Sequence, residues 1–401
     1  MSIFNPNQVY TEVLDLLHTR ALEGWTMPAL IEEVVGSLVG RGMQLYRVRI
    51  GRPILHPLYA VGTHTWYSDS GVRVDTFSRG FESQDSYRLS PLRPVFESGA
   101  LEGRYRIRTG SDSDRFPMFV RDAAEGATDY FIQLEGFNDR ATSPAAQDGI
   151  MLSWTSAAPN GFIDEEIELL QRLRKPLCVE VKSLAQRSLA KDILRAYIGS
   201  YSADRVFAGQ IQRGDADVID AVILFCDLRG SSKLAEQYDL DAYLNVLNEY
   251  FEITAGTVIE GGGEVLRYIG DAFLAIFPME RYENERDACQ DALEIALRSV
   301  ERLKHFNAQR LDQGETPIKF GIGLHCGTVM YGNIGTPGRI EFTVIGKAAN
   351  EASRIEAKCK ELNETILASG VFADYLDRLW KSHGVFELRN IARPIEIFSP
   401  G

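Results

Sequence analysis

Two aspartates beside apolar stretches are the residues of this sequence best suited to bind a charged ligand. Asp227 follows the run Ala221-Val-Ile-Leu-Phe-Cys, and Asp271 precedes the run Ala272-Phe-Leu-Ala-Ile-Phe. An ionised carboxylate beside an apolar strand is costly unless it is paired or binds a metal ion. A single strand-end aspartate usually caps a helix or closes a turn. Two such positions together suggest a site for divalent cations.

The residues that follow Asp227 favour a phosphate ligand at the same place. Gly230, Ser231 and Ser232 come next and lead into an amphipathic helical pattern. Backbone N–H groups in a loop and at a helix N-terminus can bind phosphate oxygens. Carboxylates that hold a metal ion, with such amides beside them, are what a metal-bound nucleoside triphosphate requires.

Length and composition restrict the architecture and the kinds of partner. A chain of 401 residues with 45% hydrophobic residues favours two domains, each with its own core. The formal net charge of -13 disfavours nonspecific binding to nucleic acid and to anionic membranes. Five widely spaced cysteines form no Cys-x-x-Cys pair, and neither a signal-peptide pattern nor a run of roughly 18 apolar residues occurs. We therefore expect a soluble, cytoplasmic protein with reduced thiols and no nucleic-acid or membrane partner.

The first half of the chain predicts a small α/β domain. Helical periodicity runs from residue 10 to residue 38, with a break at 24–28. Alternating patterns predict a small antiparallel sheet with long loops, at residues 44–50, 71–76, around 105, 130–134 and 151–154. His56 and His64 could be read as a haem or metal site, but two isolated histidines are more typical of ordinary polar positions. We name no ligand for this half.

A long amphipathic helix is predicted to follow this domain. Its apolar positions recur every three or four residues, at Ile167, Leu170, Leu173, Leu177, Val181 and Leu184. Such a stripe can form a core face or a short dimer seam, and Pro176 is expected to kink the helix or to split it in two. The patterns divide the chain into a first domain at residues 1–185, a helical linker at 186–217 and a second domain at 218–401.

The second half alternates between strand and helix patterns. Helices are predicted after the Asp227 strand and at residues 284–311 and 348–362. Strands are predicted at residues 221–226, 264–267, 273–277, 318–325, 329–333, 342–345 and 365–368, with two more at the C-terminal end. This order predicts an α+β fold in which helices pack on a mixed sheet.

Five sequence blocks in this half identify a family. Residues from about 218 to 400 resemble the catalytic domain of class III nucleotidyl cyclases, in particular the bacterial adenylate cyclases. The blocks occur in the family's order: Phe225-Cys-Asp-Leu-Arg-Gly-Ser-Ser, Gly262-Gly-Glu-Val-Leu-Arg-Tyr-Ile-Gly-Asp, Gly321-Ile-Gly-Leu-His-Cys-Gly, Tyr331-Gly-Asn-Ile-Gly and Glu341-Phe-Thr-Val-Ile-Gly-Lys-Ala-Ala-Asn-Glu-Ala-Ser-Arg.

The resemblance implies a function and assigns roles to residues. It implies conversion of ATP to 3′,5′-cyclic AMP and pyrophosphate, with two Mg²⁺ or Mn²⁺ ions per site bound by Asp227 and Asp271. Asn350 would orient the ribose, and Arg354 would stabilise charge on the transferring phosphorus. In the family the metal aspartates and the Asn/Arg pair come from different catalytic domains. A chain with one such domain is therefore expected to work as a homodimer.

Base selection is where the sequence departs from the family pattern. The positions that read adenine usually hold Lys and either Asp or Thr, and here they hold Arg267 and Thr343. Guanylate cyclases tend to carry Glu at the first position, which makes ATP the expected substrate. A second departure is Leu388-Arg-Asn-Ile-Ala-Arg-Pro, where many relatives have Lys-Gly. Arg389 or Arg393 in this segment is a candidate contact to the triphosphate, and a surface role is the alternative. His325 is expected to support packing.

The first half is similar to a GAF-type sensory domain, which implies a GAF-like sensor joined to the cyclase domain by the helical linker. Its regulator, a small molecule or a protein, is unknown.

Two other functions stay open for the second half: a guanylate cyclase, and a catalytically weak nucleotide-binding module, for which Arg267 is the support. A diguanylate cyclase is disfavoured because Gly270-Asp271 is followed by Ala-Phe.

Overall fold

The computed structural model describes residues 4–54, 59–80, 84–107, 112, 114–137 and 149–401. The chain divides into two compact units, Met1–Ile193 and Leu194–Gly401, and each is described by itself. No helix within the described ranges is long and apolar enough to cross a membrane.

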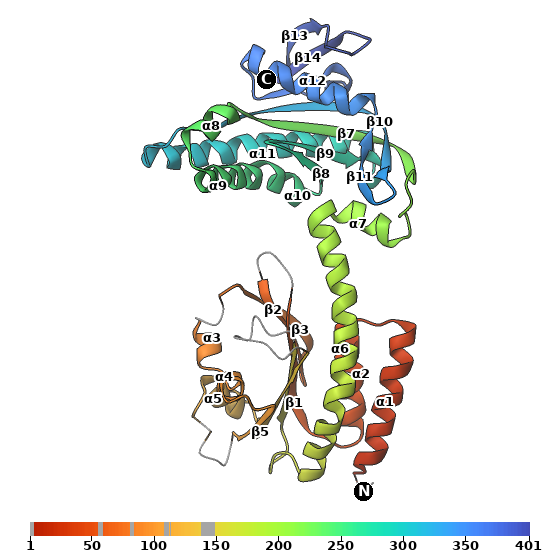
Figure 1. Ribbon diagram of the computed structural model, residues 1–401, viewed down its shortest axis with the longest axis vertical. Coiled ribbons are helices and arrows are strands. Elements are labelled where there is room, and N and C mark those ends of the chain that lie inside the picture. The colour runs from red at the N-terminus through yellow and green to blue at the C-terminus, as the bar shows by residue number, and fades with distance from the viewer. Residues whose placement is uncertain (1–3, 55–58, 81–83, 108–111, 113, 138–148) are drawn as a thin grey trace. The chain divides into compact units, whose positions relative to one another are not determined.

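The first unit contains six strands and six helices in its described residues (Figure 1). They are α1 (Pro6–Glu23), α2 (Met27–Gly40), β1 (Leu45–Pro53), β2 (Tyr59–Tyr67), β3 (Gly71–Ser78), α3 (Asp85–Arg88), α4 (Leu92–Glu97), β4 (Glu102–Arg106), α5 (Pro117–Ala124), β5 (Asp129–Gly136), β6 (Gly149–Ser156) and α6 (Asp164–Ile198).

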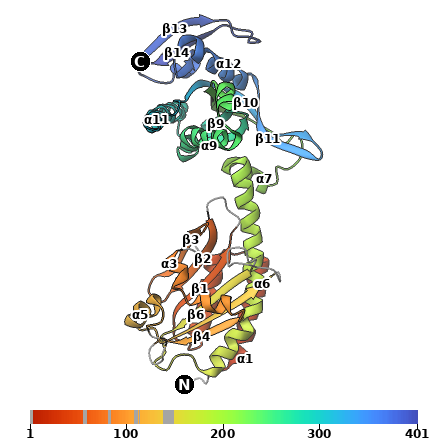
Figure 2. The ribbon, with the colours of Figure 1, turned by 60° about the vertical axis from the view of Figure 1, so that its left-hand side comes forward.

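The strands form one antiparallel sheet in the order β3-β2-β1-β6-β5-β4. Helices α1, α2 and α6 cover one face of this sheet and share a hydrophobic core with it, as Figure 2 also shows. On the opposite face, α4 and α5 pack with β4 and β5 in a second, aromatic cluster that includes Phe119 and Tyr130. The second face of the sheet is therefore covered over β4 and β5.

Local sequence explains where the first helices begin and end. The side chain of Asn5 accepts hydrogen bonds from the amides of Asn7 and Gln8, and Pro6 takes the first helical position of α1. Gly24, at φ +82°, ends α1. Thr26 caps α2 in the same way as Asn5 caps α1. The predicted helix pair with a break near residue 24 is thus confirmed.

Three details of this unit differ from the sequence-based expectations or complete them. Strand β2, which carries His64, was not predicted, and His56 lies outside the described residues. Helix α6 is continuous across Pro176, so it is not split there. Of the two roles open to the α6 stripe, the structure shows the core face: Leu170, Leu177 and the residues between them on that stripe are buried against the sheet.

The second unit follows from the end of α6. Its elements are α7 (Ser200–Phe207), β7 (Ala216–Arg229), α8 (Ser231–Gln237), α9 (Leu240–Phe251), a π-helical turn (Glu252–Gly256), α10 (Thr257–Glu260), β8 (Glu264–Ile269), β9 (Ala272–Pro278), a 3₁₀ turn (Met279–Arg281), α11 (Glu285–Asp312), β10 (Lys319–Thr336), β11 (Arg339–Ile345), α12 (Lys347–Leu362), β12 (Ile366–Ser369), α13 (Gly370–Ala373), β13 (Trp380–Phe386) and β14 (Ile395–Pro400).

Its sheet is mixed, in the order β13-β14-β12-β10-β7-β9-β8, and β11 pairs with β10 outside this row. Only β10 and β12 run parallel among these pairs. Helices α9 and α11 pack on one face of β7, against Leu224 and Cys226, and α12 packs on the other, against Ile223 (Figure 1). The predicted α+β fold of this half is confirmed.

One long strand replaces two predicted ones. Residues 318–325 and 329–333 were expected to form separate strands, but β10 is continuous and pairs with β7 from Lys319 to Gly332. Gly321, Gly323, Gly327 and Gly332 lie along it, and a Cβ at each of them would collide with neighbouring atoms. These glycines therefore reflect close packing around the strand and do not mark turns.

Candidate active site

Strand pairing brings Asp227 and Asp271 together. Asp227 lies near the end of β7, and its partner in the antiparallel register with β9 is Ala272. Asp271 comes immediately before Ala272, in the two-residue turn between β8 and β9, where Gly270 has φ +66°. Burial raises the pKa of Asp227, and the neighbouring charge of Asp271 raises this pKa further. The two partly buried carboxylates therefore lie next to each other at this end of the sheet.

This carboxylate pair has no basic partner. Within the described part of the chain, neither Asp227 nor Asp271 forms an ion pair with a lysine, an arginine or a histidine. No group of three or more His, Cys, Asp or Glu side chains suited to a metal ion occurs there either. Two adjacent, uncompensated carboxylates fit a divalent cation of the Mg²⁺ type, which takes one or two protein carboxylates and completes its shell with water and substrate phosphates.

The expected phosphate-binding residues directly follow this pair. Gly230 adopts a left-handed conformation, with φ +75° and ψ 24°, between β7 and α8. This conformation, which favours glycine, lets the chain enter α8 at Ser231, four residues after Asp227. Ser231 begins the helix, so its amide belongs to the first turn, where N–H groups have no partner within the helix.

The two residues expected to read the base lie on β8 and β11, two strands that contact each other but do not pair in the sheet. Arg267, on β8, is 43% exposed and forms an ion pair with Glu341, on β11, at 3.4 Å between Nη1 and Oε1. Thr343 comes two residues after Glu341, is 2% exposed, and has a buried Oγ1 without a hydrogen-bond partner among the residues that the structure describes. An unpartnered buried hydroxyl is costly, and it is available to a ligand.

Helix α12 directs the Asn/Arg pair away from its own sheet. Ala352, Ile355 and Glu356 are buried under the helix, whereas Asn350 and Arg354 are exposed. At about 100° per residue, Asn350 and Arg354 each lie about 160° around the helix from Ala352. The fold therefore does not bring them to Asp227 and Asp271 of the same chain.

The remaining candidates lie apart from the carboxylate pair. Arg389 is exposed in the segment between β13 and β14, directly after the buried Leu388. His325 is buried and held at both ring nitrogens, with 2.8 Å from Nδ1 to Ser369 Oγ and 2.8 Å from Nε2 to Glu351. It lies four residues along β10 from Gly321, the register partner of Asp227, which is about 13 Å.

Sequence reasoning missed Glu356. Its carboxyl is buried on the sheet side of α12, against Gly321, which pairs with Asp227 in the register. Burial, followed by the charge of Asp227, raises the pKa of Glu356 to about 7. The signal was present in the sequence, because a glutamate interrupts the apolar positions Ala352, Ile355 and Cys359 of this helix. Glu356 thus adds a third acidic group behind the pair.

Residues 216–389 match the family model described as the adenylate and guanylate cyclase catalytic domain. An adenylate cyclase of Anabaena cylindrica is 37% identical over 161 residues, which are 39% of this chain and 31% of that protein. Adenylate cyclase 1 of Rhizobium meliloti is 28% identical over 153 residues, 38% of this chain and 22% of that protein. The chain thus spans less than a third of the length of these two relatives.

Among solved structures, the adenylyl cyclase CyaB from P. aeruginosa is 23% identical and covers 46% of this chain and 94% of its own, with a TM-score of 0.43. The family-model match begins at residue 216, so the GAF-like interpretation of residues 1–185 stays a prediction. The second unit, in contrast, contains a class III adenylate/guanylate cyclase catalytic domain.

Proposed function

We propose that this protein is an adenylate cyclase, which converts ATP to 3′,5′-cyclic AMP and pyrophosphate at sites shared by two copies of the chain. One observation carries the proposal. Asp227 and Asp271 meet at one place, while Asn350 and Arg354 face outward from α12. The match to the cyclase catalytic domain and the similarity to two adenylate cyclases support the reaction.

Asp227 and Asp271 would hold two Mg²⁺ or Mn²⁺ ions, since their carboxylates lack any other counter-charge. Such ions neutralise charge on a triphosphate and lower the pKa of an attacking hydroxyl. In this proposal the amides at Gly230 and Ser231 bind the triphosphate oxygens. Arg389, exposed and with no ion pair recorded among the described residues, would provide a further contact to the triphosphate.

The second copy would supply the residues that act on the reacting groups. The amide of Asn350 would orient the ribose so that its 3′-hydroxyl faces the α-phosphorus. The guanidinium of Arg354 would stabilise the charge that develops on the transferring phosphoryl group, because its planar donors and permanent charge suit that role. A two-fold homodimer would form two equivalent sites in this way.

Base recognition would use Thr343 and Arg267. The unpartnered Oγ1 of Thr343 can form a hydrogen bond to the adenine edge without breaking an existing one. Arg267 would have to release Glu341 first. Both side chains of this pair are about half exposed, and exposed ion pairs contribute only about 0 to 1 kcal/mol. A bound nucleotide can therefore displace the pair.

Two alternatives remain distinct from this proposal. A guanylate cyclase would bind GTP with the same metal and Asn/Arg residues. A catalytically weak nucleotide-binding module is favoured by one observation, the presence of Arg267 engaged with Glu341 in place of the family's usual lysine.

We further propose that the first unit regulates the second. A GAF-like sensor at residues 1–185 and a helical linker at 186–217 would pass on the binding of an unknown regulator to the cyclase domain at 218–401. Helix α6 supports this proposal, because it is continuous from the core of the first unit to the start of the second.

A single assay tests the proposed reaction. The purified full-length chain is incubated with ATP or GTP and with Mg²⁺ or Mn²⁺, and the products are separated by chromatography. Cyclic AMP from ATP at a higher rate than cyclic GMP from GTP is the expected result. A higher rate with GTP would favour the guanylate cyclase, and no product with either nucleotide would favour the inactive module.

A further inference from the structure

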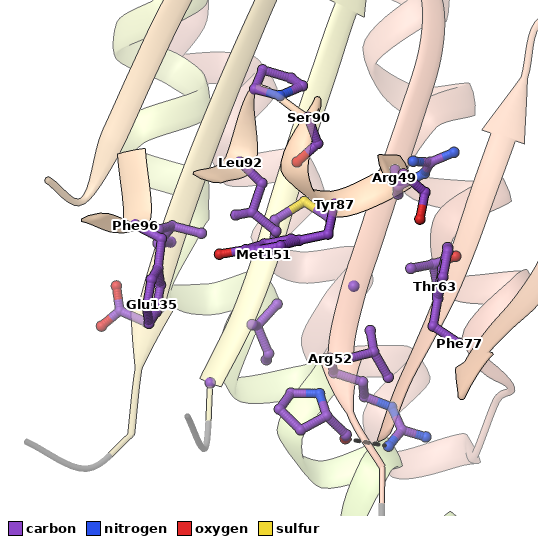
Figure 3. A pocket seen from close by; sticks show the side chains of 18 of the residues that line it. Arg49, Arg52, Thr63, Phe77, Tyr87, Ser90, Leu92, Phe96, Glu135 and Met151 are labelled. Atoms are coloured by element: carbon purple, nitrogen blue, oxygen red, sulfur yellow. Dashed lines mark hydrogen bonds between the residues drawn. The ribbon is translucent and has the colours of Figure 1, made fainter. Parts of the chain in front are cut away.

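A cavity of about 140 Å³ lies in the first unit, on the face of the sheet opposite to α1, α2 and α6. The aromatic cluster of α4 and α5 fills this face over β4 and β5. Over β1, β2 and β6 the face is hollow instead, and the segment from Ser86 to Phe96 lines the cavity from the other side. Figure 3 shows Arg49 and Thr63 at one side of the cavity and Phe96 and Glu135 across it.

Two arginines of β1 show what is unusual about this cavity. Arg47 and Arg49 are two residues apart, so they share one face of the strand. Arg47 is 1% exposed and forms two hydrogen bonds with the buried Asp122. Arg49 lines the cavity, and its one recorded hydrogen bond runs from Nε to Thr65 Oγ1, at 2.9 Å. Among the described residues Arg49 has no carboxylate within ion-pair distance.

The other polar groups of the cavity lining also suit an anionic ligand. The Oγ1 of Thr63, a residue that is 4% exposed, and the Oγ of Ser90 are buried and lack hydrogen-bond partners within the described ranges. Glu135 is the acidic residue of the lining, and Arg174 neutralises it at 3.1 Å.

Arg52 also lines the cavity. Its Nη1 donates to Pro53 O at 3.4 Å, and its Nε is buried without a partner among the described residues. The lining therefore presents two guanidinium groups without a carboxylate partner in the described ranges and two free hydroxyls, which can all donate to an anion.

We propose that this cavity binds a small organic acid with a carboxylate and an apolar body about the size of one benzene ring. The guanidinium of Arg49 holds the carboxylate, with Ser90 and Thr63 as further donors, and Phe77, Leu92 and Met151 contact the apolar body. The size follows from the volume, because a cavity of about 150 Å³ accommodates benzene. The carboxylate supplies a counter-charge for Arg49, because an uncompensated charge in an apolar cavity is costly.

Calorimetric titration of the full-length protein with benzoate, benzamide and inorganic phosphate tests this site. Benzoate is expected to bind, and benzamide, which has the same shape but no charge, is expected to bind at least about tenfold more weakly. Arg49→Gln is expected to weaken benzoate binding by at least about tenfold. Arg73→Gln is the matched control, because Arg73 is an exposed arginine of β3 that does not line the cavity.

The titration also defines the results that overturn the proposal. Equal affinity for benzoate and benzamide, stronger binding of phosphate than of benzoate, no saturable binding of benzoate, or benzoate binding unaffected by Arg49→Gln each contradicts it. If circular dichroism shows that Arg49→Gln does not fold, Ser90→Ala decides, with an expected loss of about two- to tenfold in benzoate affinity. Unchanged affinity in that variant then refutes the site. The readout is binding, so it does not depend on cyclase activity.

Discussion

In the second unit, Asp227 and Asp271 approach each other without a basic partner, whereas in the first unit Arg49 lines a cavity without an acidic one. Both statements hold for the described residues, and the signs of the charges are opposite. The two regions also differ in enclosure. The lining of the cavity comes from a single copy of the chain, whereas Asn350 and Arg354 lie on the exposed side of α12, away from the sheet that carries the carboxylate pair.

A charged side chain can either be paired within the fold or be left available to a ligand. Arg47 and Asp122 satisfy each other and serve the stability of the fold. Asp227, Asp271 and Arg49 have no ion-pair partner among the described residues, so their charges are available to a ligand. In the second unit we expect a cation and a second copy of the chain to complete the site, and in the first unit we expect a small anion to do so.

The largest effect is expected from separating the two halves of the shared site. Asp271→Ala removes the metal half and Arg354→Ala removes the half that stabilises the transition state. Each homodimer should be nearly inactive, and loss of the arginine alone should lower the rate on the order of 10² to 10³. Mixing the two variants should restore cyclic AMP formation in proportion to the heterodimer fraction, because one of the two sites in each heterodimer is intact.

The control for this experiment is a mixture of Asp227→Ala with Asp271→Ala. Both substitutions remove the same half, so every site in that mixture lacks a carboxylate. If subunit exchange is shown and the Asp271/Arg354 mixture stays as inactive as its parents, the site is not shared between copies.

The second prediction concerns the contrast between Arg47 and Arg49. Arg47→Met leaves the buried Asp122 with only the partly exposed Arg121 as a partner, and we expect a loss of roughly 3 kcal/mol in the free energy of unfolding. Arg49→Met removes one hydrogen bond and should cost about 1 kcal/mol or less. Urea unfolding followed by tryptophan fluorescence measures both, since Trp25, Trp66 and Trp154 lie in the first unit. Equal losses would show that Arg49 is also structurally paired.

The third prediction tests whether the two units are coupled. The buried residues of α6 end at Val181, so an insertion after Ser188 leaves its packing in the first unit intact. One added residue rotates the helix downstream by roughly 100°. We expect activity to fall about tenfold or more, because small misplacements of catalytic groups can reduce rates by about 10².

A seven-residue insertion at the same place is the matched control. Seven residues turn the helix by roughly 700°, which is within about 20° of the original direction, and should preserve more activity than the single residue. If the single insertion leaves cyclase activity unchanged, the linker is passive.

The catalytic residues could be found in the sequence because they lie in short continuous blocks. Asp271 stands in a two-residue turn, and Asn350 and Arg354 are four apart on one helix, so local spacing fixes their geometry. The same reasoning placed the long helices and most strands of both units, but it did not predict the short helices α3, α4 and α5. It divided β10 in two, although the strand is continuous through glycines that close packing requires.

The cavity of the first unit could not be found in this way. Its lining comes from Arg49, Thr63, Ser90 and Glu135, which belong to four separate segments and meet only through the order of the strands. Strand β2, which brings Thr63, did not show a clear alternating pattern. Sheet order depends on contacts between distant segments, and local periodicity does not determine it.

The smallest effect on activity is expected from changes to the exposed ion pair between Arg267 and Glu341. Their ion pair is exposed on both sides, so it is worth about 1 kcal/mol at most, which corresponds to about fivefold in kcat/KM. Arg267→Lys should keep or improve kcat/KM for ATP, and Glu341→Gln, which frees Arg267, should change it by less than about fivefold. Steady-state kinetics with ATP and GTP measure both variants.

The ratio of kcat/KM for ATP to kcat/KM for GTP should stay in favour of ATP, because Thr343 is unchanged. A wild-type ratio in favour of GTP would mean that Thr343 does not select adenine, and a much larger loss in Glu341→Gln would mean that Glu341 itself contacts the base.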